Sequence, residues 1–99
     1  MDYLLQLFKS VANERRLEIA ELLLKEGELP IEEIAEKLKI PLATCCRNLK
    51  ALEKVYFVSS RRKRGRALYK LNKPDKHIYN IKIIDMIKIR NQKKASRKR

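Results

Sequence analysis

The sequence lacks several features by which enzymes and secreted proteins are identified. It has no tryptophan, two glycines, one histidine and two cysteines among its 99 residues. We expect no enzyme, because there is no glycine-rich phosphate loop, no paired carboxylates and no partner for the single histidine. Two adjacent cysteines do not make a disulfide framework. No signal peptide and no apolar run of about 20 residues is found, so we expect a cytoplasmic protein without membrane contacts.

Acidic residues are scarce in the second half of the chain. Residues 41–99 hold three acids and nineteen bases, whereas residues 1–40 hold nine acids and six bases. The whole chain has a net charge of +13. An asymmetry of this size is typical of proteins that bind a polyanion, and it favours nucleic acid over an anionic membrane surface.

The hydrophobic pattern predicts helices in the first half of the chain. Residues suited to helix boundaries recur at five positions: Asp2, Asn13, Gly27, Pro30 and Pro41. They delimit a first helix after Asp2, a second over residues 14–26, a short third beginning at Pro30 and a fourth over residues 41–54. Two short helices joined by two residues predict a helix-turn-helix.

The pattern then changes to that of a basic hairpin and a final helix. Residues 56–60 and 67–71 are expected to be strands on either side of a loop over residues 61–66, which contains Gly65. The fold class is therefore mainly α with a small β-hairpin, a winged helix-turn-helix. A last helix is expected from Lys76 to about Gln92. This gives one domain over residues 1–92 and a basic, disordered tail over 93–99.

Three segments closely resemble the ArsR-type winged helix-turn-helix repressors: "LFKSVANERRLEIAELL", "GELPIEEIAEKLKIPLATCCRNLKALEK" and "GRALYKL". The resemblance covers roughly residues 4–71. It implies a homodimer that pairs through its first and last helices. It also implies that helix 41–54 enters the major groove of double-stranded DNA, with the wing over residues 58–71 on the backbone or in the minor groove.

The metal-sensing motifs of this family are absent or incomplete. The Cys-x-Cys pair of many members would fall within residues 28–32, which contain no thiol. Asp75 and His77 match the first half of a zinc motif, but the second half would fall on Lys88 and Asn91. Zinc needs about four ligands, and a lysine ammonium opposes its binding. We expect no metal and no cofactor.

The phase of helix 41–54 separates an inner face from an outer face at about 100° per residue. Cys45, Leu49 and Leu52 are expected to face the core. The candidate DNA contacts on or beside the outer face are Ala43, Thr44, Cys46, Arg47, Asn48, Lys50 and Lys54. Arg47 is the best candidate for pairing with guanine O6 and N7, and Lys50 and Lys54 are expected to meet phosphate. Cys46 also stays open as a redox-sensitive position.

The hairpin loop carries a further set of cations, which could follow phosphates or enter a narrow minor groove. These candidates are Arg61, Arg62, Lys63, Arg64 and Arg66. The family often has a glycine just before the first wing strand. Tyr56 stands there instead, so we expect that this position avoids the left-handed conformation or that the turn differs.

Three functions fit these residues. The first is a dimeric, sequence-specific transcriptional regulator, a repressor that binds half-sites about one helical turn apart. The second is a non-specific or architectural nucleic-acid binder, which the charge alone would support. The third is a protein-interaction module whose basic face meets an acidic partner.

Overall fold

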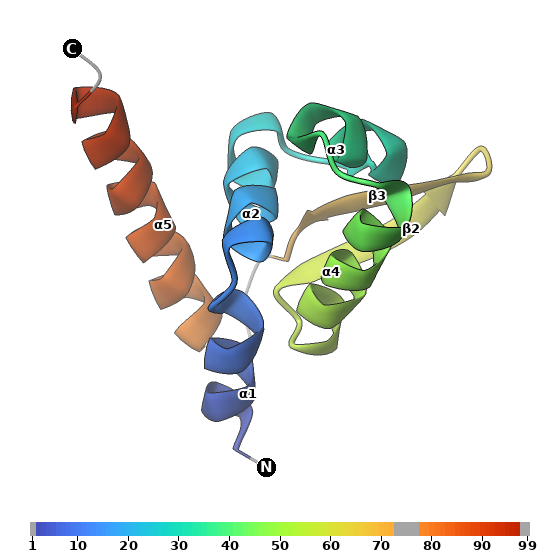
Figure 1. Cartoon of the computed structure of the whole chain (residues 1–99). Helices are drawn as coiled ribbons and strands as arrows, with labels where there is room; N and C mark the ends of the chain where they lie inside the picture. Colours follow the sequence, from blue (N-terminus) through green and yellow to red (C-terminus); the bar gives the residue numbers. More distant parts are fainter. Residues whose placement is uncertain (1, 73–77, 98–99) are drawn as a thin grey trace.

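The computed structural model describes residues 2–72 and 78–97, with the side chains of 78–94 in the second segment. The helices and strands follow one another in this order: α1 (Tyr3–Val11), α2 (Glu14–Glu26), β1 (Leu29–Pro30), α3 (Ile31–Leu38), α4 (Leu42–Lys54), β2 (Val58–Lys63), β3 (Arg66–Leu71) and α5 (Ile78–Arg97). The strands form an antiparallel sheet in the order β1-β3-β2. The β2–β3 hairpin projects from the helices as a wing, and α5 diverges from them on the opposite side (Figure 1).

The helix boundaries form where the capping residues predict. The Asp2 carboxylate accepts a hydrogen bond from the Leu4 amide at 3.1 Å, and the Asn13 side chain accepts one from the Arg16 amide at 3.2 Å. Gly27 ends α2 with φ of 81°, a conformation that suits glycine. Pro30 differs from expectation, because it pairs with β3 and precedes the first residue of α3.

The strands of the wing extend further toward its tip than the sequence suggested. Residues 61–63, expected in a loop, belong to β2, and only Arg64 and Gly65 form the turn. Strand β2 begins at Val58, not at residue 56, and β1 was not predicted at all. Tyr56 has φ of 58°, so the expectation that this position avoids the left-handed conformation is wrong.

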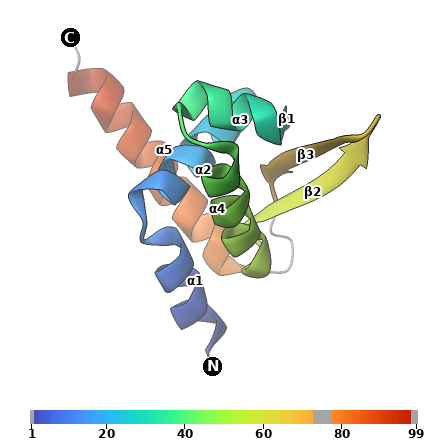
Figure 2. The same ribbon diagram turned by 45° about the vertical axis from the view of Figure 1, so that its right-hand side comes forward.

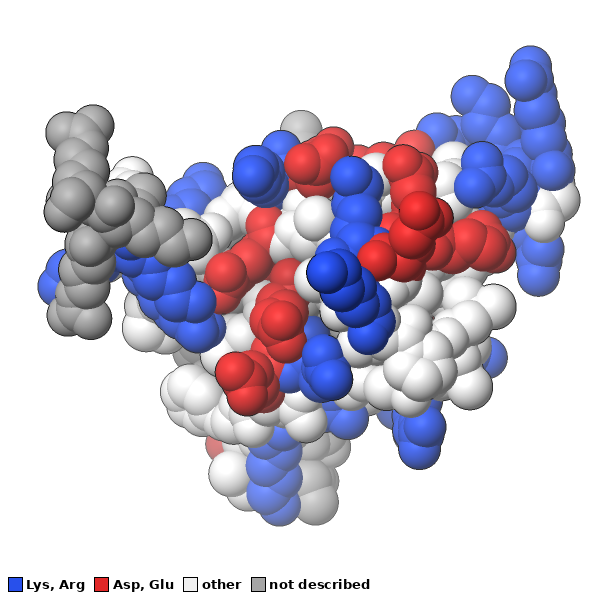
Figure 3. All heavy atoms as spheres, turned by 45° about the horizontal axis from the view of Figure 1, so that its top comes forward, with Lys and Arg blue, Asp and Glu red and all other residues white. Residues whose placement is uncertain are grey.

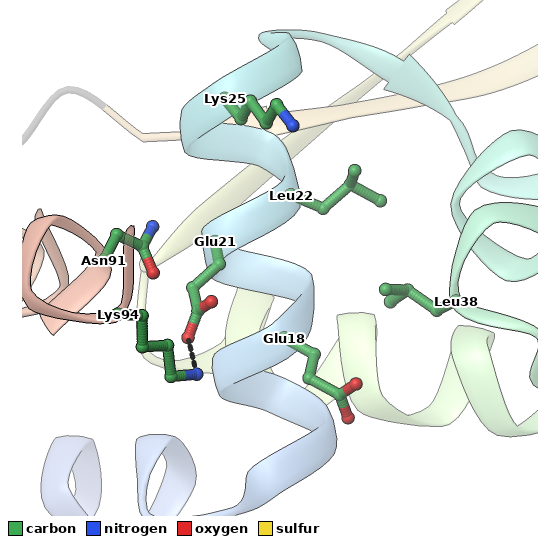
Figure 4. Close-up of a pocket in the computed structure, with 7 residues that line it drawn as sticks. All are labelled: Glu18, Glu21, Leu22, Lys25, Leu38, Asn91 and Lys94. Atoms are coloured by element: carbon green, nitrogen blue, oxygen red, sulfur yellow. Dashed lines mark ion pairs between the residues drawn. The ribbon is translucent and has the colours of Figure 1, made fainter. Parts of the chain in front are cut away.

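Helix α5 continues through Arg97, past the expected helix end at about Gln92. Ion pairs hold its second half beside α2: the Glu21 carboxylate lies 3.1 Å from Arg90 Nη1 and 3.8 Å from Lys94 Nζ. Figure 4 shows Lys94 reaching Glu21 across a cavity of ≈ 540 Å³ between the helices. Within the described residues, no helix is both long and apolar enough to cross a membrane.

The core lies between α2, α3, α4 and the base of the wing. Its most deeply buried side chains are Leu7, Ile19, Ile34, Cys45, Leu49, Leu52, Phe57 and Val58. This core fixes the orientation of α4, since the helix packs against α1, α2, α3 and β2. The exposed face of α4 is therefore determined by burial of the opposite face.

A polar network fixes the turn after α4 to the two outer helices. Asn80 at the start of α5 is fully buried, and its amide donates to the Tyr56 carbonyl at 3.0 Å. The Tyr3 hydroxyl of α1 lies 2.7 Å from Asn80 Oδ1 and 2.8 Å from the Val55 carbonyl, and it can donate its single proton to either. The network joins α1, α5 and the carboxyl end of α4.

Candidate nucleic-acid interface

Helix α4 presents a basic stripe to solvent between the wing and α1. The inward set is confirmed, because Cys45, Leu49 and Leu52 are each 0 % exposed. The exposed positions on the other side are Ala43, Arg47, Lys50 and Lys54. Figure 2 shows α4 at the front of the molecule with the wing on one side and α1 on the other. This arrangement leaves α4 free to enter a groove of DNA.

The side chain of one candidate contact on α4, Asn48, is occupied within the protein. Asn48 Oδ1 accepts a hydrogen bond from Arg16 Nε at 3.0 Å, and Asn48 Nδ2 donates to the Thr44 carbonyl at 2.9 Å. Arg16 also donates to the Ser10 carbonyl at 3.0 Å. Asn48 therefore connects α4 to α2. Sequence reasoning missed the role of Arg16, which no local spacing indicates.

The two cysteines occupy different environments on α4. Cys45 is completely buried, whereas Cys46 is half-buried and packs against the core. Burial, with a smaller contribution from the neighbouring Cys46, raises the pKa of the Cys45 thiol to about 11. The side chain of Cys46 therefore lies beside the exposed basic stripe and is not part of it.

This difference predicts selective thiol modification. At neutral pH in the folded protein, a maleimide should modify Cys46 and leave Cys45 unmodified, because the Cys45 thiol is inaccessible and protonated. Mass spectrometry should show one adduct on the native protein, two on the unfolded protein and none on native Cys46→Ser protein. Equal rates of modification at both cysteines in the native protein would contradict the prediction.

The wing carries its cations in three different situations. Arg62 donates a hydrogen bond to the Gly65 carbonyl at 3.3 Å. Arg61 makes a bidentate ion pair with Glu28, with N–O distances of 2.9 and 2.7 Å, and Arg66 lies 3.8 Å from Glu32. Among the described residues, Lys63 and Arg64 make no hydrogen bond or ion pair through their side chains. Figure 3 shows the basic side chains of the wing together at one end of the molecule, next to acidic side chains. The tip is therefore the part most available to an anion.

The Glu28–Arg61 pair holds one wing arginine toward the protein. The hydrogen bond from Arg61 lowers the pKa of the Glu28 carboxyl and raises that of the Arg61 guanidinium. Since the folded-state pKa of Glu28 is lowered, the pair is fully present above the ordinary glutamate pKa and is lost as the pH falls through the folded value. At neutral pH a phosphate must compete with Glu28 for Arg61.

The outer faces of α1 and α5 expose many apolar side chains. These are Leu5, Phe8, Ile78, Tyr79, Ile81, Met86 and Ile89. Phe8 and Met86 line an apolar hollow of ≈ 250 Å³ between the two helices. Clustered exposure of this kind marks an interaction surface.

Residues expected to bear on metal binding are only partly described. Asp75 and His77 lie outside the described residues, as do Lys76 and the end of the chain after Arg97. Within the part of the chain that the structure describes, no three histidine, cysteine or acidic side chains gather as a metal site would require.

Comparisons with known proteins agree with this geometry. A family model described as winged helix-turn-helix DNA-binding matches residues 13–54, which span α2 to α4. The homodimeric winged helix-turn-helix DNA-binding domain Mb0332 of Mycobacterium bovis, a possible ArsR-family transcriptional regulator, is 30% identical. The match covers 92% of this chain and 80% of that one, with a TM-score of 0.78. No match to a curated protein was found.

Two other solved structures are similar over most of their length. The transcriptional regulator HlyU of Vibrio vulnificus is 27% identical over 89% of this chain and 83% of its own, with a TM-score of 0.72. The transcriptional repressor PagR of Bacillus anthracis is 26% identical over 84% and 86%, with a TM-score of 0.69. These relatives are regulators and not enzymes, as the sequence predicted. The chain is a winged helix-turn-helix DNA-binding domain and belongs to the ArsR family of transcriptional regulators.

Proposed function

We propose that the protein is a dimeric, sequence-specific repressor that covers an operator with two copies of α4. The main observation that supports this proposal is the position of the exposed stripe of Arg47, Lys50 and Lys54. It lies between the wing and α1, on a helix whose other face is buried. The apolar outer faces of α1 and α5 support pairing of two copies. Such a protein acts in the compartment that holds the DNA.

The proposed roles differ along the interface. Arg47 reads a guanine edge in the major groove, while Lys50 and Lys54 contact phosphate. Ala43 and Thr44 lie in the first turn of α4 and approach the bases or the DNA backbone. Among the wing cations, those at the tip make the contacts that need no rearrangement, whereas Arg61 must first leave Glu28.

Half-buried Cys46 and Asn48 are better assigned to positioning α4 than to touching DNA, because their side chains are packed or bonded within the protein. The domain in this proposal comprises α1 to the end of α5, and metal binding has no part in it. Repression follows from occupation of the operator, which excludes polymerase.

Replacement of Arg47 by alanine tests sequence recognition. Loss of a bidentate contact should cost about 1–3 kcal/mol of discrimination, or roughly 5- to 150-fold, at the base pair that Arg47 reads. Operator sequences would be selected from a random library with wild-type protein, and affinities would be measured on selected and scrambled DNA. Lys50→Ala should instead weaken binding to both DNAs by a similar factor.

The alternative of non-specific or architectural binding is favoured by the net charge of +16 in residues 41–99. In that case the library would return no preferred sequence, and Arg47→Ala would weaken binding to all DNAs equally. Retention of full DNA affinity by both Arg47→Ala and Lys50→Ala would point to the protein-interaction module.

A further inference from the structure

A basic groove lies between α1 and α4, on the side of α4 away from the wing. It has a volume of ≈ 520 Å³ and is lined by Gln6, Lys9, Ser10, Ala51, Lys54 and Val55. Lys9 and Lys54 are exposed, whereas Val55 is buried and Ala51 half-buried. The lining thus has an apolar floor and a rim of hydrogen-bond donors, with no acidic residue.

The charge of this groove distinguishes it from the cavity between α2, α3 and α5. The cavity between α2, α3 and α5 contains Glu18 and Glu21 together with two lysines, so its charges compensate one another. In the α1–α4 groove nothing of opposite sign among the lining residues compensates Lys9 and Lys54. An anion is therefore the occupant that its chemistry favours.

The position of the groove matches a feature of DNA. The exposed stripe of α4 leads into it, because Lys54 belongs both to the stripe and to the lining. A helix is about 10–12 Å wide and the major groove about 12 Å, so a helix in the groove has a phosphate row on each side. In both ribbon views the wing lies on one side of α4 and α1 on the other (Figures 1 and 2).

We propose that the groove between α1 and α4 binds the DNA phosphate backbone on the side of the major groove opposite the wing. Lys9 is the new contact, and Gln6 and Ser10 can donate further hydrogen bonds from the same helix. Helix α1 then has two roles, one face pairing with the second copy and the carboxyl-terminal turn holding phosphate. This inference rests on the proposed entry of α4 into the major groove.

The test is the salt dependence of DNA affinity for Lys9→Gln protein. Each phosphate contact contributes about −0.9 to the slope of log K against log salt, so loss of one contact per protomer should reduce the slope of the dimer by about 1.8. Between 50 and 200 mM salt the advantage of wild-type protein should then shrink by about tenfold. The preferred DNA sequence should remain unchanged, because phosphate carries no sequence information.

Lys25→Gln is the matched control. Lys25 also occupies the last turn of its helix and is also exposed, but it lines the compensated cavity of Figure 4. It removes the same charge from the same kind of position, and its slope should equal that of wild type. Equal slopes for the two variants would overturn the inference.

Failure of the inference can be distinguished from failure of the proposed function. Slopes can be measured on scrambled DNA as well as on selected DNA, so they do not depend on the existence of an operator. Thermal melting of each variant would confirm that the fold is kept. A methylphosphonate scan of one strand should identify a single position per half-site where wild type loses affinity and Lys9→Gln loses none; additive losses at every position would also overturn the inference.

Discussion

Replacement of Met86 by lysine is expected to turn the protein into a monomer and to weaken operator binding by about 10²- to 10⁴-fold. Met86 is 54 % exposed on α5 and lies beside the apolar hollow that also contains Phe8. In a two-fold symmetric pair each copy would bring the new ammonium group into the same apolar interface, where it would be desolvated without a partner. The monomer itself should fold, because the side chain is largely outside its core.

The loss of affinity would follow from the loss of bivalent binding. When two copies are joined, the second recognition helix meets its half-site at a high effective concentration, which is worth about 10²- to 10⁴-fold. Lysine adds positive charge, so weaker binding cannot come from repulsion by phosphate. This makes lysine a more informative substitution here than glutamate.

Sedimentation in the absence of DNA would measure the assembly state, and titration of one- and two-half-site DNA would measure the affinities. Met86→Leu is the control, since it keeps an apolar side chain of similar volume and should remain dimeric. A dimeric Met86→Lys protein with unchanged affinity would show that α5 does not lie in the interface.

Much of the helical framework could be predicted because its signals are local. Asn13, Gly27 and the periodic apolar residues between them determine α2 without information from elsewhere in the chain. The inner face of α4 was predicted correctly for the same reason, since burial of Cys45 and Leu49 follows from the helical period. Such positions depend on a spacing that the sequence displays directly.

The wing and α5 were predicted less well because their signals are ambiguous. Residues 61–63 are all charged, which favours a loop on composition, yet in a hairpin that projects into solvent they can extend the strand at little cost. Strand β1 has two residues, too few for an alternating pattern. The basic end of α5 has the composition of a tail, but Glu21 on α2 supplies the partner that keeps Lys94 beside the protein.

The candidate interface shows the same limit. The sequence predicts which side chains are basic and which face of a helix they share, but not which of them another element occupies. Asn48 is bonded to Arg16, 32 residues earlier, and Arg61 to Glu28, 33 residues earlier. Lys9 lies on α1, and only the fold brings it into one groove with Lys54 of α4. Long-range partners therefore redistribute the roles that a local pattern suggests.

Replacement of Asn80 by leucine is expected to lower the free energy of unfolding by about 2 kcal/mol, although the volumes of the two side chains are similar. Asn80 is 0 % exposed. Its side chain accepts a hydrogen bond from the Tyr3 hydroxyl of α1 and donates one to the Tyr56 carbonyl in the turn after α4. Leucine would remove two part-buried hydrogen bonds, the one to the Tyr56 carbonyl and the one from the Tyr3 hydroxyl. Each such bond contributes about 0.5–1.5 kcal/mol. In a chain of this length the melting temperature should fall by roughly 10 °C.

The network has a second reason to matter. Tyr56 adopts φ of 58°, a conformation that costs a residue other than glycine about 1–2 kcal/mol. The hydrogen bond from Asn80 to the Tyr56 carbonyl helps to hold that conformation, and with it the carboxyl end of α4. The Tyr3 hydroxyl adds a link from α1 to the same turn.

Asn72→Ala is the matched control, because Asn72 donates to the same Tyr56 carbonyl at 3.3 Å through a hydrogen bond that is exposed to solvent. Its removal should change the free energy of unfolding by no more than about 0.5 kcal/mol, since water can replace the donor. Both variants would be melted at the same protomer concentration, because dimerisation makes the melting temperature depend on concentration. If Asn80→Leu melts together with Asn72→Ala and wild type, the buried amide does not hold the turn, and packing alone keeps α4 in place.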